Sequence, residues 1–170
     1  MNAYAMTKPP RPGTVVNYGK QGTDDKQRSA VCRWLPAHEG ATLLWVARMQ
    51  VLLHQANADF FGIDCQPFTT MQHTEYAATE GGHHDWHEDC NWGVNTTTAM
   101  DRKLTGVVLM TDQGQFTGGE LLVDRCGGAK LDLQQGDMIV FPSFLKHRVC
   151  PVTAGVRHSL VAWCYGPTWR

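Results

Sequence analysis

The chain has 170 residues, of which 42% are hydrophobic, enough for one domain whose core needs no disulfide or structural metal. Fifteen basic and sixteen acidic residues leave a formal net charge of -1 and are scattered, so nothing favours a nucleic-acid or anionic-membrane partner. No run reaches the roughly 18 apolar residues of a spanning helix, and the start lacks the apolar segment of a secretion signal. The sequence therefore predicts a soluble, cytoplasmic, single domain over residues 1–170.

Two segments precede the strand-rich part of the chain. Residues 1–30 are rich in Pro, Gly, Lys, Asp and Gln and have no apolar period, which indicates an extended or mobile arm, or one that caps the fold. Residues 37–61 differ, because apolar side chains there recur every three or four residues, as one face of an amphipathic helix requires. The predicted face consists of Leu43, Leu44, Ala47, Val51, Leu52 and Gln55. We expect this helical support to pack its apolar residues into the core.

Residues 67–166 hold short runs of β-forming residues separated by glycine or polar clusters. The runs are Phe68–Tyr76, His83–Asp89, Leu104–Met110, Glu120–Val123, Met138–Phe141, Arg148–Val152 and Arg157–Tyr165. They follow one another closely with no helical period between them, which favours an antiparallel sandwich or barrel over a parallel sheet with crossover helices. The sequence therefore predicts a mainly β (α+β) fold.

The run HHDWHED at residues 83–89 gathers three histidines and three acidic residues directly after Gly81-Gly82. In an extended strand, alternate residues share a side. One side would then carry His83, Asp85, His87 and Asp89, and the other His84, Trp86 and Glu88. His87 and Asp89 would offer an imidazole and a carboxylate side by side, and one more histidine would complete the 2-His-1-carboxylate set that suits Fe(II).

A helix over the same run is the alternative, because His83 and His87 would then share a face like the paired histidines of zinc hydrolases. Two features argue against it: the preceding glycines disfavour a helix, and no glutamate follows His83. The six cysteines stand far apart without a C-x-x-C pair, which fits neither a zinc knuckle nor a dense disulfide framework. We therefore favour the strand and a histidine–carboxylate metal site.

Two histidines follow the cluster, His147 and His158. His147 lies just past an apolar run, where a further strand begins. Strand alternation from Arg157 places Arg157, Ser159, Val161 and Trp163 on one face and leaves His158 on the other, as the poorer ligand. A buried arginine normally requires an anionic partner, and no acidic residue shares this face, so a ligand carboxylate is the expected partner.

The spacing of these residues matches a known family. H-x-D at residues 87–89, 57 intervening residues, His147, nine intervening residues and Arg157 form the arrangement of Fe(II)/2-oxoglutarate dioxygenases. The sequence resembles their prolyl 4-hydroxylase-like branch, of bacterial and phage type, over residues 40–166. The similar stretches include residues 55–61, 72–76, 85–89, 102–104, 118–121, 136–137, 141–149 and 151–163. His84 stands where many relatives have a tyrosine.

The resemblance implies a double-stranded β-helix, a cupin-like jelly roll, over residues 67–166, backed by N-terminal helices. It also implies an oxidoreductase that hydroxylates an unactivated C–H bond with Fe(II), 2-oxoglutarate and O2, releases succinate and CO2, and has ascorbate as a candidate reductant. By position, the catalytic residues and metal ligands would be His87, Asp89 and His147. Cosubstrate binding would fall to Arg157, on the distal carboxylate, and to the hydroxyl donors Tyr76 and Ser159.

A peptidyl proline is the default substrate that the resemblance implies. Two alternatives stay open: a 2-oxoglutarate oxygenase that acts on a small molecule, and a non-enzymatic cupin-like module that binds or senses a metal. Arg157 argues against the module, because a purely metal-binding barrel has no use for a buried cation aimed at an acid. We expect neither a nucleic-acid nor a membrane partner, and the oligomeric state is left open.

The segment Cys90–Asp101 is polar and irregular and directly follows the expected metal ligands, which predicts a loop that closes over the substrate. We expect His83 and His84 to be solvated histidines at the rim and Trp86 to be a packing residue. Arg102 and Arg148 are either surface charges or part of a substrate groove.

Overall fold

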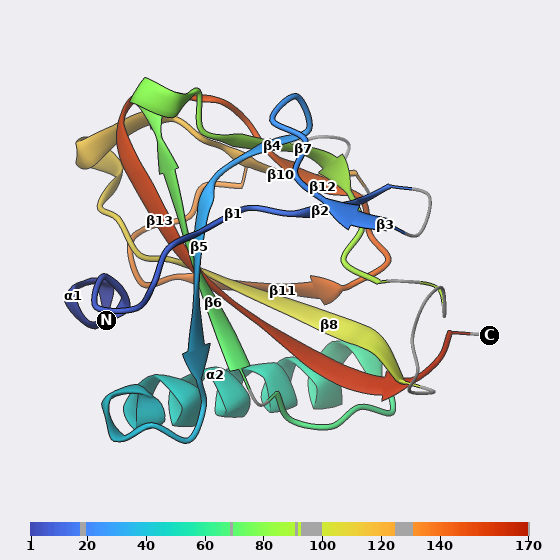
Figure 1. Cartoon of the computed structure of the whole chain (residues 1–170). Helices are drawn as coiled ribbons and strands as arrows, with labels where there is room; N and C mark the ends of the chain where they lie inside the picture. Colours follow the sequence, from blue (N-terminus) through green and yellow to red (C-terminus); the bar gives the residue numbers. More distant parts are fainter. Residues whose placement is uncertain (18–19, 69, 91, 93–99, 125–130, 170) are drawn as a thin grey trace.

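The structure is a computed structural model that describes residues 1–17, 20–68, 70–90, 92, 100–124 and 131–169. A seven-stranded sheet has the order β1-β5-β6-β13-β8-β11, with β9 paired to β13 beside this path. A four-stranded sheet with the order β10-β12-β7-β4 lies across from it (Figure 1). The named strand pairs in both sheets are antiparallel, which confirms the predicted mainly β, jelly-roll architecture.

The elements have the following bounds. The large sheet contains β1 (Arg11–Pro12), β5 (Val31–Pro36), β6 (Thr70–Ala77), β8 (Met100–Leu109), β9 (Phe116–Gly118), β11 (Met138–Pro142) and β13 (Val152–Pro167). The small sheet contains β4 (Arg28–Ser29), β7 (His83–His87), β10 (Leu121–Val123) and β12 (His147–Val149). A separate ribbon is formed by β2 (Val15–Asn17) and β3 (Lys20–Gly22). The helical elements are α1 (Asn2–Ala5), α2 (Leu43–Ala56) and short turns at Gly40–Thr42, Asn57–Phe61, Ala78–Glu80 and Gln113–Gln115.

The long strand β13 lies at the centre of the large sheet, where it pairs with β6 on one side and β8 on the other. Its alternate side chains enter two different cores, because successive residues of a strand point to opposite faces. Leu160 and Ala162 join the core between the large sheet and α2, and Val161 packs against the core between the two sheets. The predicted alternation along β13 is therefore confirmed.

The helix α2 lies under the large sheet (Figure 1), but the predicted buried face is wrong. The buried residues are Val46, Met49 and Leu53. Leu43, Leu44, Val51 and Leu52 are instead 55%, 61%, 66% and 49% exposed. Since α2 carries apolar residues around most of its circumference, its periodicity alone did not identify the face that the sheet covers.

The first 30 residues include α1, whose Ala5 is fully buried in the core beneath the large sheet. They also include β4, whose Arg28 pairs in register with His84 of β7. The strand β5, which the sequence reading did not identify, follows at once and pairs with β6 along its whole length. This N-terminal part therefore contributes both to the core and to the small sheet.

Residues 91 and 93–99 of the predicted closing loop lie outside the described residues, so closure of that loop stays a prediction. Among the parts of the chain that the structure describes, no helix has the length and apolar character needed to cross a bilayer.

Candidate functional site

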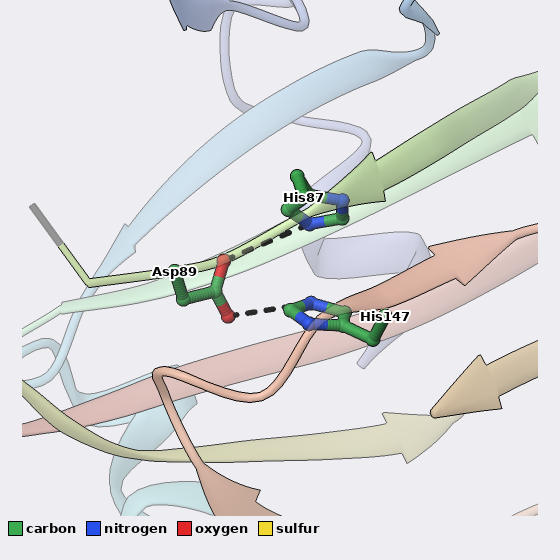
Figure 2. Close-up of side chains that lie close together, drawn as sticks. All are labelled: His87, Asp89 and His147. Carbon is green, nitrogen blue, oxygen red and sulfur yellow. Dashed lines mark ion pairs between the residues drawn. The ribbon is translucent and has the colours of Figure 1, made fainter. Parts of the chain in front are cut away.

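Two paired strands of the small sheet bring the predicted metal ligands together. His87 is the last residue of β7, His147 is the first of β12, and the two are register partners. Asp89 follows β7 by two residues, where its backbone N–H donates to the carbonyl of Ser143 at 2.9 Å. One ligand atom of each of the three residues lies within 4.8 Å of the other two. Figure 2 shows both imidazole rings facing the carboxylate, with His87 Nε2 at 3.8 Å from Asp89 Oδ1 and His147 Nε2 at 3.6 Å from Asp89 Oδ2.

Backbone carbonyls orient the two imidazole rings. His87 Nδ1 lies 2.8 Å from the carbonyl oxygen of Asp85, and His147 Nδ1 lies 2.9 Å from that of Leu145. A carbonyl oxygen only accepts, so each Nδ1 carries the proton and donates it. Each Nε2 lone pair is therefore free and directed toward Asp89, which is the way that metal-binding histidines are commonly fixed.

The carboxylate of Asp89 is held by neutral donors from the large sheet. Its Oδ2 accepts hydrogen bonds of 2.8 Å from Thr105 Oγ1 and of 2.8 Å from Trp163 Nε1. Because the Thr105 hydroxyl has only one proton to donate, the Ser143 hydroxyl, 2.9 Å away, must donate to Thr105. These contacts fix Oδ2 and leave Oδ1 on the side of His87.

The protonation states of the predicted ligands suit metal coordination. Burial by itself would raise the pKa of Asp89, but His147, His87, Arg102 and the hydrogen bond from Trp163 together lower it well below its usual range. Burial and the neighbouring His147 lower the pKa of His87 to about 4. At neutral pH the site therefore presents a carboxylate and a neutral imidazole, which are the protonation states that coordinate a divalent metal.

The donor atoms open on a cavity of about 290 Å³ that both sheets line. Arg157 lines the same cavity, is 2% exposed, and has an Nη1 without a hydrogen-bond partner among the described residues. A buried guanidinium in this condition is costly unless an anion meets it, so the cavity is suited to a ligand with a carboxylate. A 2-His-1-carboxylate set facing such a cation fits Fe(II) together with 2-oxoglutarate.

The two predicted hydroxyl donors line this cavity as well. Tyr76 of β6 is the register partner of Arg157, and the guanidinium carbon lies 5.7 Å from the centroid of its ring. Burial raises the pKa of Tyr76, so its hydroxyl stays protonated and able to donate. Ser159 lies two residues along β13 and is 2% exposed. All six residues singled out in the sequence are thus gathered around one cavity.

The predicted alternation in β7 is wrong. Between its pairings to β12, where His147 meets His87 and Val149 meets His84, β7 contains one residue more than its partner. This bulge turns Asp85 and Trp86 outward and brings His84 to the same side as His87. His84 is not a solvated rim residue, because it is 7% exposed and its ring stacks on His87 with centroids 3.4 Å apart.

The alternative of a helical zinc site is also excluded, since His83 and His87 lie on a strand. Of the two arginines left open, Arg148 pairs with Asp85 at 3.9 Å, whereas Arg102 lines the cavity.

The sequence did not predict three side chains around the site, which are Arg28, Thr105 and Ser143. It also did not predict the hydrogen bond from Trp163 to Asp89. Alternate side chains of a strand share a face, and this alternation along β8 could have suggested Thr105. No local pattern indicated Arg28, because the strand that carries it has two residues and a polar context.

Comparisons with known proteins agree with this geometry. The sequence model of the 2OG-Fe(II) oxygenase superfamily matches residues 71–165. A PKHD-type hydroxylase from Xylella fastidiosa (strain M12) is 33% identical over 70 residues, which cover 41% of this chain and 30% of that protein. A PKHD-type hydroxylase from Synechococcus sp. (strain CC9311) is 35% identical over 86 residues, covering 49% of this chain and 36% of the relative. The matched region thus spans about a third of these curated relatives.

Solved structures show the same fold. A Pseudomonas putida prolyl-4-hydroxylase has a TM-score of 0.67 and 22% identity, with 91% of this chain and 76% of that chain covered. A prolyl hydroxylase from Trichoplax adhaerens, solved with a hypoxia inducible factor peptide fragment, has a TM-score of 0.73 and 17% identity, covering 96% and 73%. The family match includes more than half of the chain and contains every predicted site residue. The chain therefore belongs to the 2OG-Fe(II) oxygenase superfamily and has the fold of its prolyl hydroxylase-like members.

Proposed function

We propose that this protein is an Fe(II)- and 2-oxoglutarate-dependent hydroxylase in which His87, Asp89 and His147 hold the iron. One observation carries the proposal: three convergent ligand atoms open on a cavity that also contains the buried guanidinium of Arg157, whose Nη1 has no hydrogen-bond partner among the described residues. Neither feature alone selects the reaction class. Together they match a cosubstrate that chelates a metal at one end and carries a carboxylate at the other.

In this proposal each side chain has a defined task. Arg157 binds the distal carboxylate of 2-oxoglutarate through its planar fork, and Tyr76 and Ser159 donate hydroxyl hydrogen bonds to the same molecule. Thr105 and Trp163 keep Asp89 oriented toward the metal. Bound iron would supply the activation of O2 that couples decarboxylation of 2-oxoglutarate to succinate with hydroxylation of a substrate C–H bond.

The proposed substrate is a peptidyl proline. The support is the fold shared with prolyl hydroxylases, one of which was solved with a peptide fragment. The aromatic rings of Trp34 and Trp163 line the cavity with centroids 6.0 Å apart, and such a surface suits an aliphatic ring.

The test is the visible spectrum of the anaerobic protein titrated first with Fe(II) and then with 2-oxoglutarate. We expect a weak charge-transfer band that requires both additions. Asp89→Ala should abolish the band because the metal loses its carboxylate ligand. Arg157→Ala should keep the band but require far more 2-oxoglutarate, because the distal carboxylate loses its partner. Asp85→Ala is the matched control, since this exposed acid lies in β7, four residues before Asp89, and outside the cavity.

Stoichiometric iron binding without a band would contradict the proposal and favour the metal-binding module. A band followed by succinate formation with small molecules but not with proline peptides would keep the reaction class and replace the peptide substrate.

A further inference from the structure

The cavity carries more positive charge than the proposed reaction uses. Three arginines line it, Arg28, Arg102 and Arg157, against one carboxylate, that of Asp89. An Fe(II) ion and a 2-oxoglutarate dianion cancel each other and leave the balance unchanged.

Arg102 is placed to meet a ligand beside the metal. Its guanidinium carbon lies 3.9 Å from the centroid of the Trp163 ring, and the same indole donates to Asp89 Oδ2. Stacking of this kind holds a guanidinium flat and leaves its edge available. The Arg102 guanidinium donates a long hydrogen bond of 3.5 Å, from Nη1 to the carbonyl oxygen of Asp89. The fork of Arg102 therefore lies next to the metal ligands without an ion pair to a carboxylate among the described residues.

Arg28 supplies a second cation on another wall of the cavity. It is 9% exposed, and its two Nη atoms donate to the carbonyl of Thr14 at 3.0 Å and to Cys32 Sγ at 3.1 Å. Both partners are neutral, because burial raises the pKa of the Cys32 thiol and keeps it protonated. The charge of Arg28 is thus held in place without being neutralised by these contacts.

Among the described residues that line the cavity, Asp89 alone carries a carboxylate. The residues outside the described part of the structure, at 18–19, 69, 91, 93–99, 125–130 and 170, include no aspartate or glutamate. Asp101, the acid next to Arg102 in the sequence, is 1% exposed and does not line the cavity, and its Oδ1 accepts the backbone N–H of Arg102 at 2.8 Å. With the cosubstrate bound to Arg157, the excess positive charge faces the space left for the substrate.

We propose that the substrate carries a carboxylate close to the carbon that is hydroxylated, and that Arg102 binds it, with Arg28 adding to the positive potential. This inference rests on the proposed function and narrows its substrate class from any peptidyl proline to an anionic one. A carboxylate on Arg102 would place the adjoining ring against the Trp34 and Trp163 surface, in front of the metal ligands. The carboxylate can belong to a free proline, a C-terminal proline or an acidic neighbour of an internal proline, and the recognition chemistry is the same.

Three matched probe pairs separate these sources. They are L-proline and L-prolinamide, acetyl-glycyl-proline and its amide, and acetyl-aspartyl-prolyl-glycinamide and its asparaginyl counterpart. Binding to the protein loaded with Fe(II) and 2-oxoglutarate is measured anaerobically by calorimetry. We expect the anionic member of at least one pair to bind about tenfold tighter or better, the size of one charge-assisted hydrogen bond. Arg102→Gln should reduce that preference to less than about threefold.

Two further variants keep the outcome interpretable. Arg48→Gln removes the same charge from the exposed surface of α2 and should leave the preference intact. Arg102→Lys keeps the charge and loses the planar fork, so it should give an intermediate preference and serves if Arg102→Gln does not fold. Equal binding within every pair, absence of binding by all probes, or a preference unchanged in both Arg102 variants would overturn the inference.

The same samples distinguish this failure from failure of the proposed function. If the wild type shows the charge-transfer band with Fe(II) and 2-oxoglutarate but no preference for the anionic probes, only the inference of an anionic substrate is contradicted. If the band itself is absent, the proposed reaction class is contradicted.

Discussion

In the proposed metal site, Asp89 depends on neighbours that are not themselves metal ligands. Thr105→Val removes the hydroxyl that donates to Asp89 Oδ2 and also leaves the buried Ser143 hydroxyl without its acceptor. We expect Fe(II) affinity to fall roughly 10- to 100-fold, as is usual when a hydrogen bond to a metal ligand is lost, and stability to fall by about 1 to 3 kcal/mol. Competition with a chelator measures the affinity. Thr117→Val, at an exposed position of β9, is the matched control. Unchanged iron affinity in Thr105→Val would show that Trp163 alone orients the carboxylate.

Gly119 gives Arg157 the room for its position. A Cβ at Gly119 would lie 2.8 Å from Arg157 Cδ, and the backbone φ of +67° disfavours any other residue. Gly119→Ala should therefore displace the guanidinium and raise the dissociation constant of 2-oxoglutarate about tenfold or more, while iron affinity stays within about twofold.

The measurement is anaerobic titration of the iron-loaded protein with 2-oxoglutarate. Gly40→Ala serves as the control, because nothing lies within 4 Å of a Cβ at that position. Equal loss of iron and cosubstrate affinity would mean that the substitution disturbs the whole site rather than Arg157.

At the scale of single elements, α2 offers two adjacent leucines in opposite environments. Leu53 is 2% exposed and packs in the core beneath the large sheet, whereas Leu52 is 49% exposed. We expect Leu53→Ala to lower the free energy of unfolding by about 2 to 5 kcal/mol, since it removes buried methyl groups and leaves a cavity. Leu52→Ala should change it by less than about 1 kcal/mol. Urea denaturation measures both, and a larger loss for Leu52→Ala would mean that another surface covers the outer face of α2.

Local periodicity predicted some elements well and others poorly, for physical reasons. In β13 the side chains alternate without interruption from Arg157 to Trp163, so the cavity face could be read from the sequence. In β7 the bulge after His84 breaks the alternation, and a bulge depends on how β12 pairs with it rather than on β7 itself. In α2 apolar residues surround the helix, so the buried face is decided by the sheet beneath it.

At the scale of the whole molecule, the packing of α1 against the large sheet makes stability depend on pH. His73 is fully buried, its Nε2 lies 3.2 Å from Asn2 Oδ1, and its ring centroid is 5.0 Å from that of His158. Burial and the neighbouring His158 lower the pKa of His73 to about 4. An unfolded histidine titrates near 6.5, so as the pH falls the unfolded chain takes up the proton first. The stability contribution is therefore complete above about pH 6.5 and is lost as the pH falls toward about 4.

The expected loss attributable to His73 is roughly 3 kcal/mol over that interval. It is measured by urea denaturation at several pH values. His73→Gln should flatten the pH dependence relative to the wild type, although its stability at neutral pH is lower. His54→Gln, on the exposed side of α2, should leave the slope unchanged. Parallel slopes in the wild type and His73→Gln would exclude His73 as the source.

The overall topology was predictable only in outline. The run of β-forming segments identified the strands of the core, and the spacing of His87, Asp89, His147 and Arg157 predicted four residues of the candidate site. The pairing of β5 with β6 and of β4 with β7 was not accessible, because those strands are short or precede the helix and pair with partners at least 34 residues away. Such pairings are set by long-range packing, which no local window of sequence contains.

The two faces of β13 have a consequence for how the gene tolerates substitution. Leu160 and Ala162 pack in the core between the large sheet and α2, and Arg157, Ser159 and Trp163 line the cavity. In a saturation mutagenesis library scored separately for cellular abundance and for turnover, Leu160 and Ala162 should lose abundance, and Arg157, Ser159 and Trp163 should lose turnover at near-normal abundance. A plot of the two scores along this strand would then oscillate out of phase with a period of two residues, so one segment would report folding and catalysis independently.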